Sequence, residues 1–216
     1  MTQRLIVILT ITFALAAFAI TGFFYTRNAP APQTAVASAE NTTLVRPASP
    51  VIGRADARVT IVEFFDPACE SCRAFHPTVK QILAEHKNDV RLVMRYAPLH
   101  KGSEEAVRIL EAARLQGKFE PVLEALLNAQ PVWASHSAPD LNKAWDAAQK
   151  AGLDEAKARR DMSSPEITAI LRQDIADMAA VRLKGTPTFF VNGKQPPQFG
   201  RRELADFVRA EVQATR

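Results

Sequence analysis

The amino-acid sequence predicts an α/β domain with a helical insertion, preceded by an apolar N-terminal segment. Two β-branched runs, at residues 59–65 and 90–96, flank a stretch of helical periodicity. A long helical region, about 101–182, follows before the pattern returns to a strand at 188–191. The chain has 216 residues, of which 47% are hydrophobic, so it suits one domain and is not a disordered protein.

The N-terminal segment is long and apolar enough to span a membrane. Residues 5–25 carry no charge and would extend about 31 Å as a helix, the thickness of a bilayer core. We therefore expect residues 1–27 to form a single transmembrane helix in the inner (cytoplasmic) membrane. The alternative is a signal segment that is cleaved, for which Ala35-Val36-Ala37 offers small residues. Both interpretations place the remaining chain in the periplasm or outside the cell.

Residues 28–50 are rich in Ala, Pro, Ser and Thr, and we expect them to form a flexible tether. The tether is too short for a dimerisation domain, so we expect a monomer whose folded domain is 51–216. The net charge is only +4, and no basic run with interleaved aromatic residues is present. This composition argues against nucleic-acid binding.

The first part of the domain has a strand–helix–strand pattern. Residues 59–65 are β-branched and aromatic and stop at Asp66-Pro67, which is typical of a buried central strand. A helix over 70–86 and a second strand over 90–96 should follow. A connection of this length favours parallel pairing of the two strands.

The helical insertion has several start and stop residues. Helices should begin near four of them, Ser103, Pro121, Asp140 and Ser164. After strand 188–191, Asn192-Gly193 predicts a hairpin turn and a short further strand. An amphipathic helix over 202–212 should end the domain.

Both cysteines of the chain lie in one tetrapeptide, Cys69-Glu70-Ser71-Cys72. A Cys-x-x-Cys pair directly after a strand, at a helix start, predicts a redox site. The free N–H groups and the dipole of the helix favour an anion at its first residues, so Cys69 should be the nucleophile. Cys72, which lies deeper in the helix, should resolve the mixed disulfide.

The cysteine pair has three alternative interpretations. In a zinc site, His76 could be a third ligand, and His86, His100 or His136 a fourth, but none has a typical ligand spacing. Covalent haem is excluded because Arg73 stands where that motif needs histidine. A purely structural disulfide would close a very small loop and contribute little stability.

The sequence resembles the DsbA branch of the thioredoxin superfamily over about residues 50–212. Residues 62–72 resemble its strand, turn and active-site helix, and residues 184–193 resemble its cis-proline loop and hairpin. The resemblance implies a thioredoxin fold with an inserted helical domain. It also implies a redox-active Cys69–Cys72 disulfide, protein substrates and no cofactor.

The resemblance also implies roles for single residues. Pro187 matches the cis-proline that faces the dithiol, and Thr186 borders the site, where its backbone could bind an extended substrate. Glu63 matches the buried acid behind the dithiol, which should have a raised pKa and relay the proton of Cys72. A glutamate at a strand edge that faces water is the alternative for Glu63. Pro77 matches the proline that kinks the active-site helix.

The two residues between the cysteines depart from the family pattern. The best-known strong oxidant of the family has Pro-His there, whereas this chain has Glu70-Ser71. Glu70 should raise the pKa of Cys69, and Ser71 can offer only a neutral hydrogen bond. We therefore expect a Cys69 pKa of about 5–7 and a weaker oxidant.

Together these features predict an extracytoplasmic thiol–disulfide oxidoreductase that exchanges disulfides with proteins. We favour a dithiol oxidase that a membrane redox partner reoxidises. A membrane-tethered reductase or isomerase is the first alternative. A copper- or zinc-binding module is the second.

Overall fold

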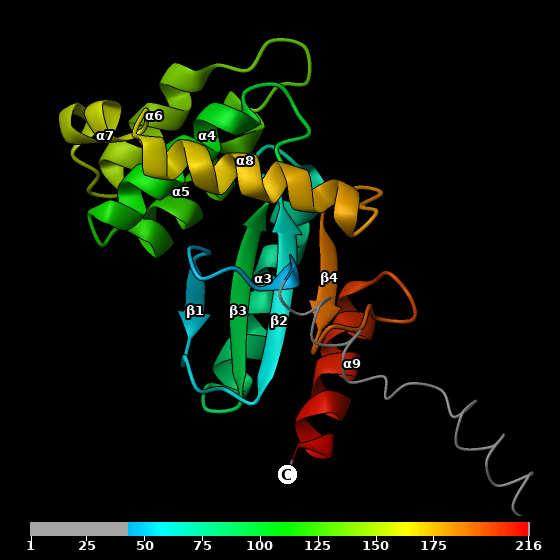
Figure 1. Cartoon of the computed structure of the whole chain (residues 1–216). Coiled ribbons are helices and arrows are strands. Elements are labelled where there is room, and N and C mark those ends of the chain that lie inside the picture. The colour runs from blue at the N-terminus through cyan, green and yellow to red at the C-terminus, as the bar shows by residue number, and fades with distance from the viewer. Residues whose placement is uncertain (1–42, 216) are drawn as a thin grey trace, which may run out of the picture. The chain divides into compact units, whose positions relative to one another are not determined.

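Four strands form one mixed sheet in the order β1-β3-β2-β4, shown in Figure 1. Strands β2 and β3 are parallel, as the sequence predicts, while β1 and β4 run antiparallel to their neighbours. The strands are β1 (Val51–Gly53), β2 (Val59–Phe65), β3 (Val90–Tyr96) and β4 (Thr188–Val191).

The computed structural model describes residues 43–215. The predicted membrane anchor and residues 28–42 of the predicted tether lie outside the described residues. The chain divides into two units, Met1–Ser38 and Ala39–Arg216, and the sheet with its helices belongs to the second. Within residues 43–215, no helix has the length and apolar character that a bilayer span requires.

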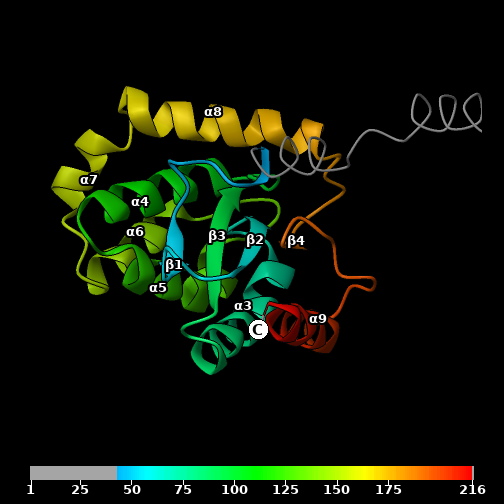
Figure 2. The ribbon, with the colours of Figure 1, turned by 60° about the horizontal axis from the view of Figure 1, so that its bottom comes forward.

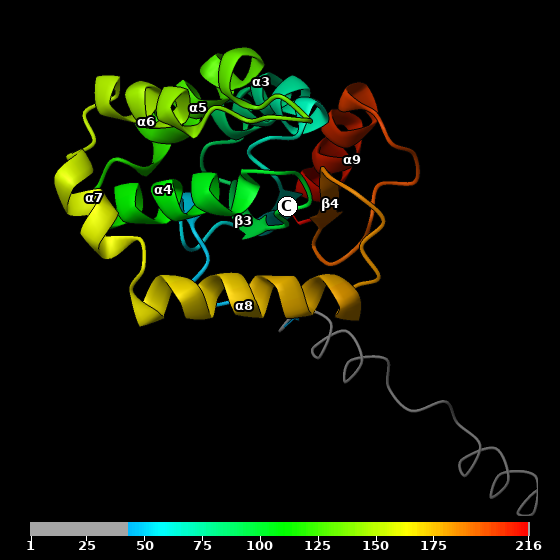
Figure 3. The same cartoon turned by 90° about the horizontal axis from the view of Figure 1, so that it is seen from above.

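Helices cover both faces of the sheet, as Figures 2 and 3 show. Helices α3 and α9 lie on one face, and α8 lies on the other. The inserted helices, α4 to α8, lie between β3 and β4 in the chain. The bounds are α3 (Glu70–Glu85), α4 (Ser103–Leu115), α5 (Phe119–Trp133), α6 (Leu141–Lys150), α7 (Glu155–Asp161), α8 (Pro165–Ala180) and α9 (Arg201–Ala214).

Alternation along β2 divides its side chains between two apolar clusters. Ile61 and Phe65 pack into the larger cluster with residues of α3, α5 and α9. Val62 and Phe64 pack into a smaller cluster, where Met178 from α8 contributes. Because alternate residues of a strand point to the same face, residue 63 lies with Ile61 and Phe65 on the face that α3 covers.

The sequence missed two elements and predicted one that is absent. Strand β1 has only three residues, and α7 begins after Asp154, whose side chain accepts a hydrogen bond from the Lys157 N–H (2.9 Å). The strand predicted after Asn192-Gly193 does not form, and only an isolated bridge joins Val191 to Lys194. Two prolines follow at 196 and 197, and because they lack N–H groups they cannot extend the ladder.

The packed structure begins before residue 51, where the sequence analysis placed the start of the domain. Leu44 is 3% exposed and belongs to the smaller apolar cluster. The Arg95 guanidinium donates to the carbonyl oxygens of Thr43 (2.6 Å) and Leu44 (2.7 Å). The last residues of the expected tether are therefore part of the fold.

A buried ion-pair network joins β3 to α8. Arg95 is fully buried and donates to Asp174 (2.8 Å) and Asp177 (2.6 Å). Asp174 also accepts from the backbone N–H of Tyr96 (2.8 Å), and Arg46 donates to Asp177 at 2.8 and 2.7 Å. Every charge in this network has a partner, which its burial requires.

Removing the cation of this network should strongly destabilise the fold. The Arg95→Met variant leaves Asp174 buried without its cation, so the free energy of unfolding should fall by about 3–5 kcal/mol. Urea denaturation measures this change. The matched control is Arg54→Met at the exposed Arg54–Asp56 pair, which should leave stability nearly unchanged. Equal effects of the two substitutions would contradict the prediction.

Candidate active site

The two cysteines lie at the start of α3, directly after the central strand β2. Cys69 is the N-cap residue of α3, and Cys72 lies in its first turn. Both are free thiols, 6% and 0% exposed respectively. The backbone N–H of Cys69 donates to the Asp66 carbonyl (3.1 Å), which holds the turn between strand and helix.

The start of α3 favours a thiolate on Cys69, as its position in the sequence predicts. A hydrogen bond from the Cys72 thiol is the largest cause that lowers the pKa of Cys69, and burial opposes it. The Thr186 side chain and the backbone N–H groups of Ser71 and Cys72 act in the same direction as the Cys72 thiol. The resulting pKa of Cys69 is about 5, at the lower end of the range expected from the sequence.

Cys72 has the opposite environment. Burial raises its pKa far above the ordinary value, and the neighbouring Cys69 and Glu63 add to the shift. The backbone N–H of Asp66, 3.4 Å from the Cys72 sulfur, offsets only part of it. Cys72 is therefore a thiol under conditions in which Cys69 is a thiolate, and the two sulfurs are chemically inequivalent.

The loop before β4 faces the dithiol. The Thr186–Pro187 bond is cis, as the family resemblance implies, and the Thr186 carbonyl lies 3.2 Å from the Cys69 sulfur. The Thr188 hydroxyl donates to the Gly185 carbonyl (2.7 Å), which closes the loop on itself. Residues 117 positions apart in the chain are thus brought into hydrogen-bond contact.

Glu63 lies behind the dithiol on the α3 face of β2. It is 3% exposed, so the alternative of a strand-edge glutamate facing water is wrong. Burial is the main cause that raises its pKa, to about 8, and the negative charge of Cys69 contributes. A carboxyl with this pKa is largely protonated at neutral pH.

The side chain of Glu70 is exposed to solvent. It is 69% exposed, and its carboxylate lies 3.4 Å from Nε2 of His136. The effects predicted for Glu70 and for the Ser71 side chain on Cys69 stay predictions.

One residue of the inserted helices holds the active-site turn. Gln130 of α5 is 2% exposed and donates to the carbonyl oxygens of Pro67 (2.8 Å) and Cys69 (3.0 Å). Its own carbonyl accepts from Arg73 (2.9 Å). The sequence analysis missed Gln130, because a single glutamine on an amphipathic helix has no distinguishing pattern.

His76, the expected third ligand of a zinc site, has a carboxylate partner instead. Nε2 of His76 lies 3.0 Å from the carboxylate of Glu124 on α5. Across residues 43–215, no three His, Cys, Asp or Glu side chains cluster in a way that could hold a metal ion.

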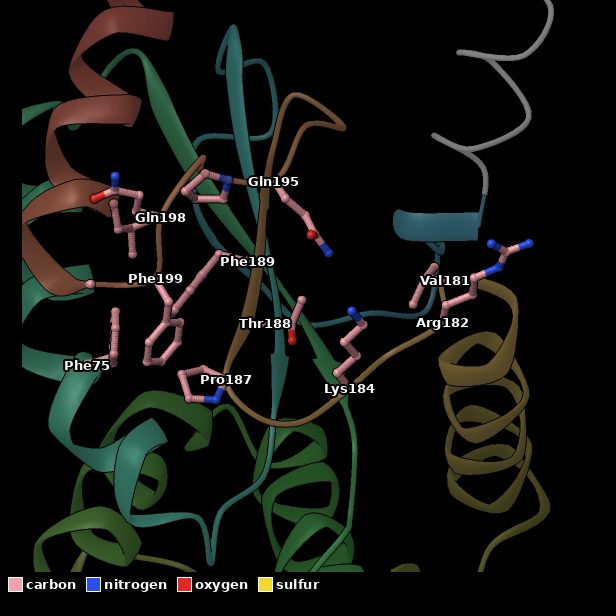
Figure 4. A pocket seen from close by; sticks show the side chains of 13 residues that line it. Phe75, Val181, Arg182, Lys184, Pro187, Thr188, Phe189, Gln195, Gln198 and Phe199 are labelled. Atoms are coloured by element: carbon pink, nitrogen blue, oxygen red, sulfur yellow. The ribbon is translucent and has the colours of Figure 1, made fainter.

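A groove of about 530 Å³ lies beside Pro187. Figure 4 shows Phe75 and Phe199 next to this proline, and their ring centroids are 4.9 Å apart. Phe199 is 71% exposed, although it is a large apolar side chain. Basic and amide side chains complete the lining, among them Arg182, Lys184, Gln195 and Gln198.

Comparison with known proteins agrees with this architecture. A family model described as thioredoxin matches residues 46–206. A thioredoxin-like oxidoreductase from Silicibacter pomeroyi DSS-3 is 35% identical, with a TM-score of 0.68, over 78% of this chain and 94% of that chain. The thiol-disulfide exchange protein alpha-DsbA2 from Wolbachia pipientis shares the fold, with 18% identity and a TM-score of 0.69 over 83% and 93% of the chains.

Curated relatives are much longer than this chain. The Na(+)/H(+) antiporter NhaA from Herminiimonas arsenicoxydans is 32% identical over 143 residues, which are 66% of this chain and 22% of that protein. NhaA 1 from Mycolicibacterium gilvum (strain PYR-GCK) is 32% identical over 178 residues, or 77% and 27%. The chain thus spans about a quarter of the length of these relatives.

A mixed sheet, a Cys-x-x-Cys pair at a helix start and a facing cis-proline define the thiol–disulfide oxidoreductase class. The chain belongs to the thioredoxin family, and its inserted helices give it a DsbA-like fold. Proteins of this kind exchange disulfides through the cysteine pair itself and need no cofactor.

The pKa of Cys69 can be measured by titrating the ultraviolet absorbance of its thiolate in the reduced protein. Absorbance should rise with pH around a midpoint of about 5. The Cys69→Ser variant should lose this transition, because Cys72 stays protonated. A midpoint near the ordinary value of 9.0, or below about 4, would contradict the assignment.

The raised pKa of Glu63 predicts a pH-dependent loss of stability. Between its ordinary value of 4.5 and about 8, the unfolded chain releases a proton that the folded protein keeps. In this window, the free energy of unfolding of the wild type should fall relative to that of Glu63→Gln by about 1.4 kcal/mol per pH unit.

Urea denaturation of the reduced proteins from pH 5 to 8 would test this prediction. Cys69 contributes to the pH dependence with the opposite sign, but equally in both proteins, so the difference isolates Glu63. A matched exchange at the exposed Glu104, Glu104→Gln, should give a flat difference. A flat difference for Glu63 as well would refute the raised pKa.

Proposed function

We propose that this protein is a thiol–disulfide oxidoreductase that oxidises dithiols in protein substrates. The observation that carries the proposal is the position of Cys69. Its sulfur lies at the N-terminus of α3, has a pKa of about 5 and contacts the Thr186 carbonyl on the cis-proline loop.

The reaction starts from the Cys69–Cys72 disulfide. A substrate thiolate attacks the Cys69 sulfur, and the bond between Cys69 and Cys72 breaks. The electron pair goes to the Cys72 sulfur, which takes up a proton because its pKa is strongly raised. Glu63, buried on the same face of β2 and protonated near neutral pH, is the proposed donor of this proton.

A second substrate thiolate completes the exchange. It attacks the substrate sulfur of the mixed disulfide and expels Cys69 as a thiolate. The substrate leaves with a disulfide, and the protein keeps the two electrons as its dithiol. Cys69 is a good leaving group because its thiolate is stabilised, and this property supports the direction of oxidation.

The groove beside Pro187 supports an extended peptide as the bound form of the substrate. Its exposed aromatic side chain, Phe199, can pack against apolar residues of an unfolded chain. The Thr186 backbone borders the Cys69 sulfur, where an extended strand can form hydrogen bonds.

We further propose a location outside the cytoplasm, with residues 1–27 as a membrane anchor. A membrane redox partner would reoxidise the dithiol, and the protein would act as a monomer. The uncharged run at residues 5–25 supports the anchor. Na⁺/H⁺ exchange, named in the curated relatives, is not proposed, because the chain covers only 22% and 27% of the two compared.

Replacing Cys72 should trap the reaction at the mixed disulfide between Cys69 and the substrate. In the full chain with Cys72→Ser, expressed in a bacterium, Cys69 has no internal partner. Mixed disulfides with substrate proteins should accumulate and be visible on a non-reducing gel. The control Cys69→Ser should form none, and equal amounts from both variants would contradict the proposed roles.

The redox state of the wild-type protein in the same bacterium shows the direction of electron flow. Alkylation of free thiols in the wild-type protein should show it mainly oxidised. A mainly reduced protein would instead favour the reductase or isomerase.

A further inference from the structure

His100, in the loop between β3 and α4, is fixed next to the dithiol by a single buried carboxylate. Nδ1 of its ring lies 2.7 Å from Oδ2 of Asp66, and its backbone N–H donates to the same oxygen (3.1 Å). The side chain is 31% exposed, so the ring also reaches solvent. Two bonds to one oxygen restrict both the loop and the imidazole.

Asp66 has hydrogen-bond donors on both of its carboxylate oxygens. Oδ1 accepts from the Ala68 N–H (2.9 Å) and from the Ser103 hydroxyl. Oδ2 accepts from the Leu99 N–H (2.7 Å) in addition to His100. Because its neighbours donate, the carboxylate can act as a pure acceptor, which is the arrangement that suits a protonated imidazole.

The residue that holds His100 also holds the cysteines. The Asp66 carbonyl accepts from the Cys69 N–H (3.1 Å), and the Asp66 N–H lies 3.4 Å from the Cys72 sulfur. His100 is therefore connected to the dithiol through one rigid, fully buried residue. The two cysteines are buried, so a charge on the imidazole acts on their sulfurs with less screening than between two exposed groups, although the 31% exposure of the ring weakens the interaction.

The surroundings of His100 are mixed in charge. Asp66 and Cys69 face it from the segment between β2 and α3, and Glu70 faces it from the first position of α3. His136 faces it from the loop after α5, with ring centroids 5.9 Å apart, and is itself 3.4 Å from Glu70. Lys101, which follows His100 in the same loop, donates a hydrogen bond to the Ser137 carbonyl.

These neighbours favour the protonated form of His100. Burial lowers the pKa of its imidazole, but the hydrogen bond and charge of Asp66 outweigh burial, and Cys69 and Glu70 add to them. The pKa of His100 therefore lies above its ordinary value of 6.5. His100 is then a cation at pH 5, where the Cys69 thiolate forms.

We propose that His100 is a redox-tuning residue, whose imidazolium, held by Asp66, stabilises the Cys69 thiolate from a loop outside the Cys-x-x-Cys motif. This proposal rests on the proposed function and adds a residue that contributes to the reduction potential of the Cys69–Cys72 pair. The dipeptide Glu70-Ser71 offers no cation to the thiolate, whereas the loop after β3 does.

Removing the cation should destabilise the thiolate and with it the reduced form. In His100→Gln, which keeps an N–H donor for Asp66, the titration midpoint of Cys69 should rise by about one pH unit. At pH 6, which is the expected midpoint of the variant, the equilibrium with glutathione should then move about fivefold toward the protein disulfide. His86→Gln, at the far end of α3, is the matched control and should change neither value.

A second measurement uses the wild-type protein and does not depend on the folding of a variant. Coupling between two sites is reciprocal, so the Cys69 thiolate must raise the pKa of His100 as much as the imidazolium lowers that of Cys69. NMR titration of the His100 ring should give a midpoint about one pH unit higher in the reduced protein than in the oxidised protein.

The two measurements together separate tuning from a structural role. A His100 midpoint that is the same in both redox states would overturn the proposal, even if His100→Gln altered Cys69 by moving the loop. An unchanged Cys69 midpoint in folded His100→Gln would overturn it as well. Neither result touches the proposed function, which the trapping of mixed disulfides by Cys72→Ser and the redox state of the wild-type protein in cells test separately.

Discussion

The chemistry of this site depends on the free backbone N–H groups in the first turn of α3, which are directed at the Cys69 sulfur. A helix start has N–H groups without partners in the helix, and here they are directed at Cys69 instead of at a capping side chain. The turn stays in place because its carbonyl groups are bound by Gln130 from α5. The inserted helices therefore support the geometry on which the low pKa of Cys69 depends.

Asp66 has a comparable role on the other side of the turn. It is fully buried, yet it accepts hydrogen bonds from Leu99, His100 and Ser103 in the segment after β3. Its backbone contacts both cysteines. The carboxyl end of β2, the loop after β3 and the start of α4 thus meet at one side chain, and the dithiol lies against it.

Much of the fold could be predicted from the sequence because local patterns determine it. The apolar runs of β2 and β3, the helical periodicity of α3 and the cysteine spacing are all properties of contiguous segments. The roles of Gln130 and His100 could not be predicted in this way, because each depends on contacts with residues that are distant in sequence. Asp66 lies within residues 62–72, which resemble the family motif. Its hydrogen bonds to the loop after β3 become visible only in the structure.

The ion pairs around Arg95 have a mechanical consequence. Arg46 is bonded to Asp177, and the carbonyl groups of Thr43 and Leu44 are bonded to Arg95. A pulling force on the chain ahead of Thr43 would therefore be transmitted to β3 and α8 through these charged contacts.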